Sequence, residues 1–394
     1  MPTCRLFLVV SLLLLGAAPA LADEDGESLF DVEVHGFVSQ GAIKTIRNNF
    51  LVPNSKRGSF DLTEAGINFT KPVSDRLRLG FQLFGGGFVP TGAYNAKLDW
   101  FYLDYHWKDW LGIRAGRVKL PFGLYNEIND VDSARVPALL PQSTYPVANR
   151  NFLLAQTGFE IYGYLGSERA GALEYRLYGG TIVFDLAPQQ SGLPYVVRGV
   201  DFAYLAGGRL MWELPVEGLR LGGSAQVLRL DADLQGTTDP RFTGHIEIPA
   251  VLWMGSLEYS AHDWLLAAEY GRWHSKRESN IMAPPPLGTG LAAAPWTANE
   301  RYYALVAYRF TPHFQLGSYY AGFFPNVDKR HGRENQQHDV AGTLRIDITP
   351  NWLLKLEGHY LKGTAYLSAA LNDRPIQYLS SRWALFMLKT TAYF

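Results

Sequence analysis

Hydrophobic and polar residues alternate with a period of two along most of this chain. In the stretch 352–366, for example, Trp352 and Leu354 fall on one face, and Lys355 and Glu357 fall on the other. Successive side chains of a β-strand point to opposite faces of a sheet, so this pattern predicts strands. Sixteen strands are predicted, with the approximate bounds 31–46, 59–71, 75–89, 97–107, 111–119, 156–166, 171–184, 200–213, 219–234, 245–259, 264–277, 300–310, 313–324, 336–348, 352–366 and 378–394.

The connections between the predicted strands alternate strictly between short and long. The short connections are 71–75, 108–110, 167–170, 214–218, 260–263, 311–312 and 349–351. The long connections are 47–58, 90–96, 120–155, 185–199, 235–244, 278–299, 325–335 and 367–377. Because the two kinds alternate, all long connections fall at one end of the sheet. An even number of strands then puts both termini at the end with the short turns.

This arrangement is typical of a bacterial outer-membrane barrel, which has short periplasmic turns and long outer loops. A sheet in hydrocarbon must also close, since lipid cannot satisfy the polar groups of a free edge. We therefore predict an all-β fold, a sixteen-stranded antiparallel transmembrane β-barrel. Fourteen or eighteen strands are the near alternatives, because a hairpin can be missed or split. Within 245–259, Pro249 interrupts the alternation and predicts a β-bulge.

The start of the chain fits export. Residues 1–22 have the features of a secretory signal peptide, with the positive Arg5, an apolar core at 6–15 and a small-residue cleavage site. The only cysteine, Cys4, lies in this peptide, so the mature chain 23–394 has no cysteine for a disulfide. An exported chain without disulfides needs a large core or a closed hydrogen-bond network.

The end of the chain suggests partners. Phe394 shares a face of the last strand with Leu388 and Phe386. A terminal aromatic on a closing strand resembles the signal read by the barrel assembly machinery, which implies that machinery as a partner. Outer-membrane lipid and lipopolysaccharide are the other expected partners. Removing the signal peptide takes away one of the 36 basic residues, Arg5, and leaves 35 against 37 acidic residues. This near balance favours no nucleic-acid partner.

The long connection 120–155 has an unusual composition. A loop of this length is rare in a compact structure unless it is functional. It contains many residues able to bury surface, among them Leu124, Tyr125, Leu139 and Leu140, whereas a solvated linker has few. We therefore expect an ordered loop that packs inside a large cavity, and it is the third long connection from the N-terminus.

In sixteen-stranded general porins the third outer loop folds into the barrel and narrows it. The strand before this loop also resembles the G-R-x-K-x-P-F-G-L-E stretch of the phosphate-selective porin family (porins O and P). The chain departs from that stretch at Tyr125, which replaces the acidic residue, and Glu127 follows two positions later. The resemblance implies an outer-membrane porin for passive diffusion of small polar solutes, including anions such as phosphate, and a homotrimer is plausible because general porins trimerise. The matching residues are Gly116, Arg117, Lys119, Pro121, Phe122, Gly123 and Leu124.

Charges near the constriction would set the selectivity of such a channel. The loop candidates for the pore constriction are Lys119, Glu127, Asp130, Asp132, Arg135 and Arg150. The candidates on the lumen wall are Arg78, Arg176, Arg209, Arg220, Arg309 and Arg345. We expect Lys119 and Arg135 to face the permeation path. The alternative is that wall arginines pair with carboxylates of the wall and loop and simply hold the loop in place.

Other classes of function have less support in the sequence. The chain has no G-x-S-x-G, H-E-x-x-H or C-x-x-C motif, and we assign no catalytic residue, metal site or cofactor. For an outer-membrane barrel enzyme, the nearest candidates are His274 with Ser275 and Asp328 with His331. A structural or adhesion barrel with a closed lumen is the main alternative to a porin.

Overall fold

The computed structural model describes residues 32–87, 94–167, 169–183, 195–237, 239, 241–282 and 289–394. The helices in this part of the chain are η1 (Asp132–Ala134), η2 (Val147–Asn149), α2 (Arg150–Leu153), η3 (Arg333–Asn335), α3 (Ala369–Asn372) and η4 (Ile376–Tyr378). None of these described helices is long and apolar enough to cross a membrane. The strands are β1 (Glu33–Ile46), β2 (Ser59–Ser74), β3 (Leu77–Gly86), β4 (Lys97–Lys108), β5 (Leu111–Lys119), β6 (Ala155–Ser167), β7 (Gly171–Thr181), β8 (Tyr195–Glu213), β9 (Leu219–Gly236), β10 (Thr243–Ala261), β11 (Trp264–Ser275), β12 (Glu278–Met282), β13 (Thr289–Ala293), β14 (Thr297–Thr311), β15 (Phe314–Phe324), β16 (Gln337–Thr349), β17 (Trp352–Gly363) and β18 (Arg382–Tyr393).

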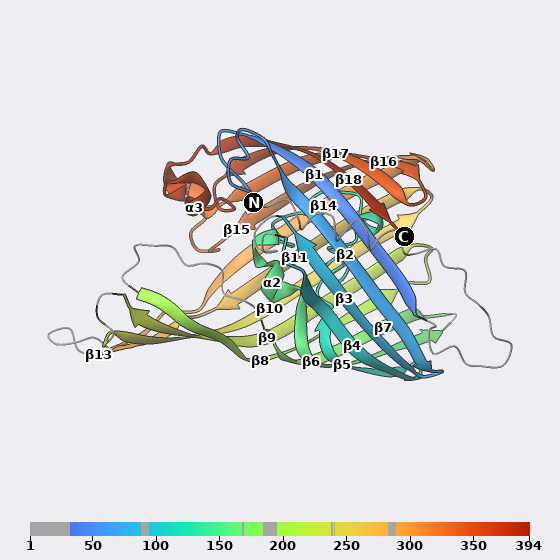
Figure 1. The fold of residues 1–394 in the computed structure, drawn as a ribbon, viewed down its shortest axis with the longest axis horizontal. Helices are drawn as coiled ribbons and strands as arrows, with labels where there is room; N and C mark the ends of the chain where they lie inside the picture. Colours follow the sequence, from blue (N-terminus) through green and yellow to red (C-terminus); the bar gives the residue numbers. More distant parts are fainter. Residues whose placement is uncertain are drawn as a thin grey trace, which may run out of the picture. The chain divides into compact units, whose positions relative to one another are not determined.

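These strands form one antiparallel sheet that closes on itself (Figure 1). The first strand pairs with the last, from Phe37 opposite Tyr393 to Ile46 opposite Ala384. The labels β11 and β12 denote successive parts of one barrel strand, because both pair with β10; β13 and β14 form the next barrel strand in the same way. The predicted closed, sixteen-stranded antiparallel barrel is confirmed. It lies within the unit Glu33–Phe394, and the predicted signal peptide 1–22 lies outside the described residues.

The predicted bulge at Pro249 is wrong. The pairing of β10 with β9 runs through Pro249, opposite Arg229, without a shift in register. The disturbance is instead on the other side of β10, where β11 ends at Ser275 and β12 begins at Glu278. Proline has no N–H to donate to a neighbouring strand, so the ladder breaks there without needing an extra residue.

The short turns all lie at one end of the barrel. Six of the seven connections that we predicted to be short hold only two or three residues, and the longest of the seven is 214–218. The C-terminus lies at the same end, because the N–H of Tyr393 donates to the carbonyl of Asn351, in the turn between β16 and β17, at 2.9 Å. The connection 120–154 lies at the opposite end of the strands that it joins, β5 and β6.

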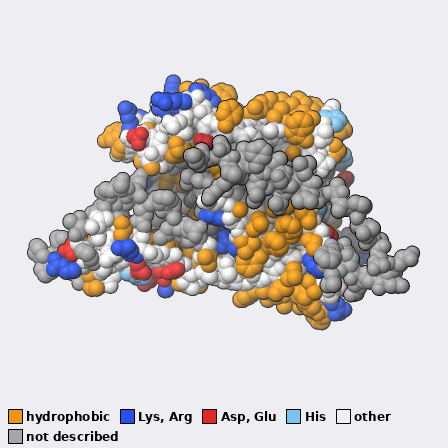
Figure 2. Space-filling view, in the orientation of Figure 1, with side chains coloured by type: hydrophobic (Ala, Val, Ile, Leu, Met, Phe, Trp, Pro, Cys, Tyr) orange, Lys and Arg blue, Asp and Glu red, His pale blue; other side chains and the backbone are white. Residues whose placement is uncertain are grey.

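The two faces of the sheet have opposite chemistry. On β17, Trp352, Leu356 and Tyr360 point outward and are exposed, whereas Lys355 and Glu357 point inward and are buried. Figure 2 shows hydrophobic side chains gathered over the outer face of the strands. Apolar residues outside and charges inside suit a barrel surrounded by lipid. Exposed aromatic residues cluster near the short turns: Trp107, Trp110, Trp212, Trp264, Phe310 and Trp352.

Candidate functional site

The connection 120–154 lies inside the barrel. It makes hydrogen bonds to strands around the whole sheet, including Ser39 on β1, Ser224 on β9, Glu269 on β11 and Glu357 on β17. One segment can reach all of these strands only from within the ring that they form. Figure 1 shows this segment, with α2, among the strands. We call residues 120–154 the inner loop.

Two glycines with positive φ shape the backbone here, Gly116 within β5 and Gly123 at the start of the inner loop. Gly116 has φ 134° and Gly123 has φ 69°, backbone conformations that other residues rarely adopt. A Cβ on Gly123 would lie 2.6 Å from the Tyr145 hydroxyl and 2.7 Å from Oε1 of Glu269. The N–H of Gly123 also donates to the Ser224 hydroxyl at 3.0 Å. The path of the backbone therefore explains both glycines in the stretch Gly116–Leu124.

Apolar residues of the inner loop pack on the wall in three clusters. Leu139 packs in a cluster with Leu361 and Trp383, on one side of the barrel. In the second cluster, Leu120 and Phe122 pack against β8 to β11. In the third cluster, four loop residues pack against β11 to β16: Tyr125, Val136, Leu140 and Tyr145. The loop is thus ordered and packed, as its composition predicted.

Asp132 is the most heavily contacted charge of the inner loop. Its carboxylate lies 2.8 Å from Nζ of Lys389 and accepts hydrogen bonds from the hydroxyls of Thr391 (2.7 Å) and Ser39 (3.2 Å). Arg135 of the same loop lies 2.6 Å away. Burial alone would raise the pKa of Asp132, but Lys389 and Arg135 outweigh burial and hold that pKa below its ordinary value. The side chain is therefore an ionised anchor.

The wall also satisfies the backbone of the inner loop. The carboxylate of Glu357 accepts the N–H groups of Ala138 (2.7 Å) and Leu139 (2.9 Å). Nζ of Lys355 donates to the carbonyls of Asp132 (2.8 Å), Arg135 (2.7 Å) and Pro137 (3.1 Å). Buried backbone groups outside secondary structure need such partners. The side chains of Lys355 and Glu357 on β17 therefore supply the hydrogen bonds that a neighbouring strand would otherwise give to the backbone of the loop.

A second carboxylate holds the opposite side of the loop. Glu269 on β11 accepts the N–H of Leu124 at 2.9 Å and the hydroxyls of Ser256 (2.6 Å) and Tyr303 (2.9 Å). The Tyr145 hydroxyl of the loop also donates to it. The loop is thus fixed to β11 and to β17 and β18.

Arg150 fixes the end of the inner loop to β4. Its guanidinium lies 2.9 Å from Asp99 and 3.0 Å from Asp130, and it stacks on the ring of Phe84 at 4.1 Å. Burial alone would lower the pKa of Arg150, but the carboxylates of Asp130 and Asp99 outweigh burial and raise that pKa above its ordinary value. The pKa of Asp130 is lowered, because Arg150 and Lys119 outweigh the effect of burial there.

A third group of charges is partly exposed. Glu127 of the loop pairs with Arg176 at 2.6 Å and with Arg209 at 2.9 Å. Lys119 donates to the carbonyl of Glu127 at 2.8 Å and lies 3.7 Å from Asp130. Unlike the anchors above, these side chains retain contact with the space inside the barrel, since 17% of Lys119 and 22% of Glu127 is exposed.

The structure therefore divides the six charges predicted at the constriction. Asp130, Asp132, Arg135 and Arg150 are buried and paired, and Lys119 and Glu127 are accessible. The expectation that Arg135 faces the permeation path does not fit its surroundings. Its guanidinium is buried and donates to the carbonyls of Pro137 (2.9 Å) and Ala138 (2.5 Å), so it shapes the loop.

The six predicted wall arginines all pair with carboxylates. Arg176 and Arg209 pair with Glu127, and Arg345 pairs with Asp347 at 2.9 Å while donating to the carbonyl of Ser133 in the loop. The other pairs are Arg78 with Asp104, Arg220 with Glu258 and Arg309 with Asp347. This pairing fits the alternative in which wall arginines hold the loop and the wall together.

Exposure within these pairs is unequal. Side-chain exposure is 51% for Arg78 against 0% for Asp104, and 40% for Arg220 against 9% for its partner Glu258. Arg309, at 33%, is also more exposed than Asp347, at 16%. These three arginines lie near the short turns, and each is more exposed than the carboxylate that it pairs with. We call Arg78, Arg220 and Arg309 the mouth arginines.

The sequence interpretation missed one inward arginine. Arg114 on β5 lies 3.0 Å from Glu160 and 3.4 Å from Asp104. Its position between Ile113 and Ala115 could have indicated an inward side chain, but the surrounding glycines weaken the alternation there.

The structure places the candidate enzyme residues as follows. His274 and Ser275 are adjacent on β11, so their side chains point to opposite faces of the sheet. Asp328 and His331 lie in the connection after β15, where the N–H of Asp328 donates to Oδ1 of Asn326. Among the described residues, no group of three His, Cys, Asp or Glu side chains could hold a metal ion.

Comparison with known proteins places the architecture. No protein-family model matches the chain, and a search of curated proteins found no match. Among solved structures, the outer-membrane protein OmpT of Vibrio cholerae superposes with a TM-score of 0.57 at 10% identity, covering 92% of this chain and 97% of that chain. The fold is that of outer-membrane porins.

Two further porin-fold structures support this conclusion. The anion-selective porin of Comamonas acidovorans has a TM-score of 0.53 at 9% identity, covering 92% of this chain and 99% of the porin. OmpF of Salmonella typhi, in complex with daunomycin, has a TM-score of 0.54 at 14% identity, covering 92% and 97%. Identities this low support a shared porin fold and carry no solute preference to this chain.

Proposed function

We propose that this chain is an outer-membrane porin that lets small polar solutes diffuse passively, with a preference for anions. The exposure of the mouth arginines carries the proposal. At the short-turn end a solute would meet these guanidinium groups more readily than their carboxylate partners, which are less exposed. Because the stretch Gly116–Leu124 resembles a stretch of the phosphate-selective porins, inorganic phosphate is one anion to test.

The inner loop narrows the lumen, so that charged groups can influence which solutes pass. Sixteen strands enclose a wide lumen, and porins of this size leave an aqueous channel. A packed loop across the lumen narrows the path, so that a solute must exchange part of its hydration for groups on the wall. The anchors at Asp132, Glu269 and Arg150 keep that loop in one place.

Around Glu127, beside the inner loop, the exposure of acidic and basic side chains differs from that at the short-turn end. Side-chain exposure is 22% for Glu127 and 33% for Glu174, against 18% for their partner Arg176. Both signs of charge are therefore accessible beside the inner loop. Anion preference would arise at the short-turn mouth, and the loop would mainly limit size.

Planar-bilayer recordings of the purified protein test this proposal. In a gradient of potassium chloride, the reversal potential of the wild type should show chloride preference. The triple variant Arg78→Gln, Arg220→Gln, Arg309→Gln should lose that preference and shift toward potassium. Arg241→Gln is the matched control, because Arg241 is exposed in the connection between β9 and β10, where it pairs with Asp239. An unchanged reversal potential in the triple variant would refute the anion proposal.

The same recordings separate the porin from its alternatives. Absence of conductance in every salt would favour a structural or adhesion barrel with a closed lumen. We further propose assembly as a homotrimer, recognition of Phe394 by the barrel assembly machinery, and contacts with outer-membrane lipid and lipopolysaccharide. Native mass measurement in detergent would give the number of subunits.

A further inference from the structure

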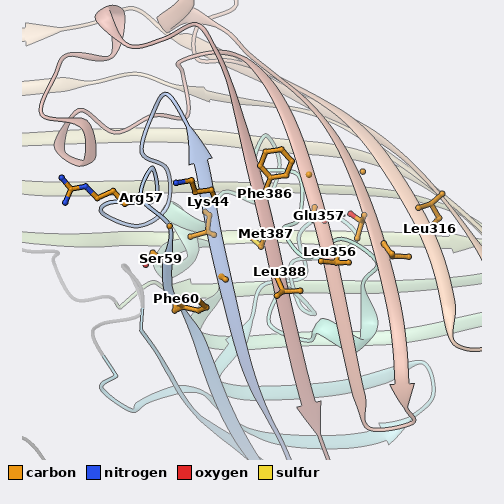
Figure 3. A pocket seen from close by; sticks show the side chains of 17 residues that line it. Lys44, Arg57, Ser59, Phe60, Leu316, Leu356, Glu357, Phe386, Met387 and Leu388 are labelled. Carbon is orange, nitrogen blue, oxygen red and sulfur yellow. Dashed lines mark hydrogen bonds between the residues drawn. The ribbon is translucent and has the colours of Figure 1, made fainter.

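A groove of about 700 Å³ lies on the outward face of β1, β16, β17 and β18 (Figure 3). Two of its lining residues, Gly342 and Gly358, pair with each other across β16 and β17. A Cβ built on Gly342 would meet no atom within 4 Å. Large apolar side chains surround the glycines: Leu316, Leu344, Leu356, Phe386 and Leu388. The groove is thus an apolar depression on the lipid-facing wall.

One end of this groove is basic. Lys44 and Arg57 line it, and Figure 3 shows their side chains at the same end. Lys44 pairs in register with Phe386, and its Nζ donates to the carbonyl of Lys56 at 2.7 Å, a neutral acceptor that leaves the ammonium charge uncompensated. Lys362 and Arg382 face each other on β17 and β18, closer to the long loops.

Carboxylates do not neutralise this end. The groove residue Glu357 turns to the lumen, where it accepts the inner-loop N–H groups and His359. Asp61 accepts a hydrogen bond from the Ser59 hydroxyl. Neither carboxylate forms an ion pair with Lys44 or Arg57 in the described chain. Two cations without an anionic partner among the described residues therefore lie beside an apolar groove, and this combination suits a ligand that has both an anionic group and a hydrocarbon chain.

We propose that this groove binds lipid A, the phosphorylated and multiply acylated part of lipopolysaccharide. An acyl chain would lie over Gly342 and Gly358, and a phosphate would pair with Lys44 and Arg57. The basic end lies toward the long loops, so in the proposed topology it is at the level of outer-leaflet head groups. This inference rests on the proposed outer-membrane location. It favours lipid A over a phospholipid, because a head group with two phosphates and no cation complements Lys44 and Arg57, which have no carboxylate partner in the part of the chain that the structure describes.

The barrel contains its own control. A second apolar groove, of about 690 Å³, lies between β7, β8 and β9 and includes Gly223. A Cβ on Gly223 would also meet no atom within 4 Å. Its only charged lining residue is Arg209, which turns to the lumen and pairs with Glu127. This groove offers hydrocarbon contact without cations.

Native mass spectrometry of the delipidated protein with added lipids tests the proposal. The probes are hexa-acylated bis-phosphorylated lipid A, its dephosphorylated form, and phosphatidylglycerol. The double variant Lys44→Gln, Arg57→Gln should weaken binding of phosphorylated lipid A at least about tenfold, since each cation near an anionic lipid surface contributes on the order of a few-fold in affinity. The same variant should leave binding of the dephosphorylated form nearly unchanged.

Filling the grooves gives the matched comparison. Gly342→Leu should weaken binding of both forms of lipid A, whereas Gly223→Leu should weaken neither. Equal binding of phosphorylated and dephosphorylated lipid A by the wild type, or equal effects of the two leucine variants, would overturn the proposal. So would loss of the oligomer in Gly342→Leu, because the groove would then be a subunit interface. Channel conductance should stay unchanged in every variant, so failure here is distinct from failure of the proposed porin function.

Discussion

At the residue scale, Asp132 joins the inner loop to three strands. Its carboxylate contacts Lys389 and Thr391 on β18 and Ser39 on β1, and Lys355 on β17 binds its carbonyl. Removing one partner of a buried ion pair leaves the other charges uncompensated, which costs more than the pair itself contributes. Asp132 is therefore the side chain whose loss should affect loop anchoring most.

We predict that Asp132→Asn destabilises the protein by about 3–5 kcal/mol, the range for breaking a buried ion pair. The buried Lys389 and Arg135 would lose their shared anion. Thermal unfolding in detergent, followed by circular dichroism, measures this change. Asp239→Asn removes an exposed ion pair with Arg241 and serves as the control. Equal melting temperatures for the two variants would contradict the assigned role.

The lowered pKa of Asp132 predicts a pH dependence. A carboxyl with a lower pKa in the folded protein stabilises the fold above its ordinary value of 3.8, and this stabilisation is lost as pH falls through the lowered pKa. Loop anchoring should thus be constant from pH 8 to about pH 4 and weaken below that. Single-channel recordings at decreasing pH should then show larger and noisier conductance. Asp132→Asn should lack this acid-induced step, and an identical step in that variant would disprove the assignment.

At the scale of elements, the inner loop depends on its junction with β5. Phe122 packs into the wall cluster directly after β5, and Gly123, with positive φ, follows it. The wall in turn presents Lys355 and Glu357 to the backbone of the loop. If the loop is removed, water can fill the lumen and solvate these charges, so the barrel itself should survive.

Deleting 126–144 should therefore raise single-channel conductance and reduce size discrimination. The physical reason is that the segment contacts opposite walls, where Glu127 pairs with Arg176 on β7 and the N–H of Ala138 donates to Glu357 on β17. Conductance in planar bilayers and uptake of sugars of increasing size by liposomes measure both effects. Heat modifiability on gels confirms that the shortened barrel is folded. A folded deletion variant with wild-type conductance would show that the loop does not limit passage.

At the scale of the whole molecule, the alternation of short and long connections predicts an orientation. The short turns and the C-terminus lie at one end, since Asn351 bonds Tyr393. A cysteine at Arg374, in an exposed position between β17 and β18, should react with a membrane-impermeant thiol reagent on intact cells. A cysteine at Asn351 should react only after lysis. The reverse labelling would invert the proposed topology.

The alternation of hydrophobic and polar residues, together with the alternation of short and long connections, predicted the barrel, its sixteen strands and its two faces. The physical reason is local: a strand in lipid must show apolar residues on every second position, and hydrocarbon forces the sheet to close. The position of the inner loop followed from its length, apolar residues and place in the order of connections. The junction of β5 with that loop also carried a local signal in its glycines.

Only the tertiary structure decided which charges line the lumen and which are anchors. Asp132 meets Thr391, 259 residues away, and Arg135 is buried by carbonyls of its own loop. Such pairings depend on where a loop settles against strands that are distant in sequence, and period-two alternation contains no information on that. The basic groove likewise arises because Lys44, Phe386 and Gly358 come into register across three strands. Sequence determines which face each residue occupies, and closure of the barrel determines its neighbours.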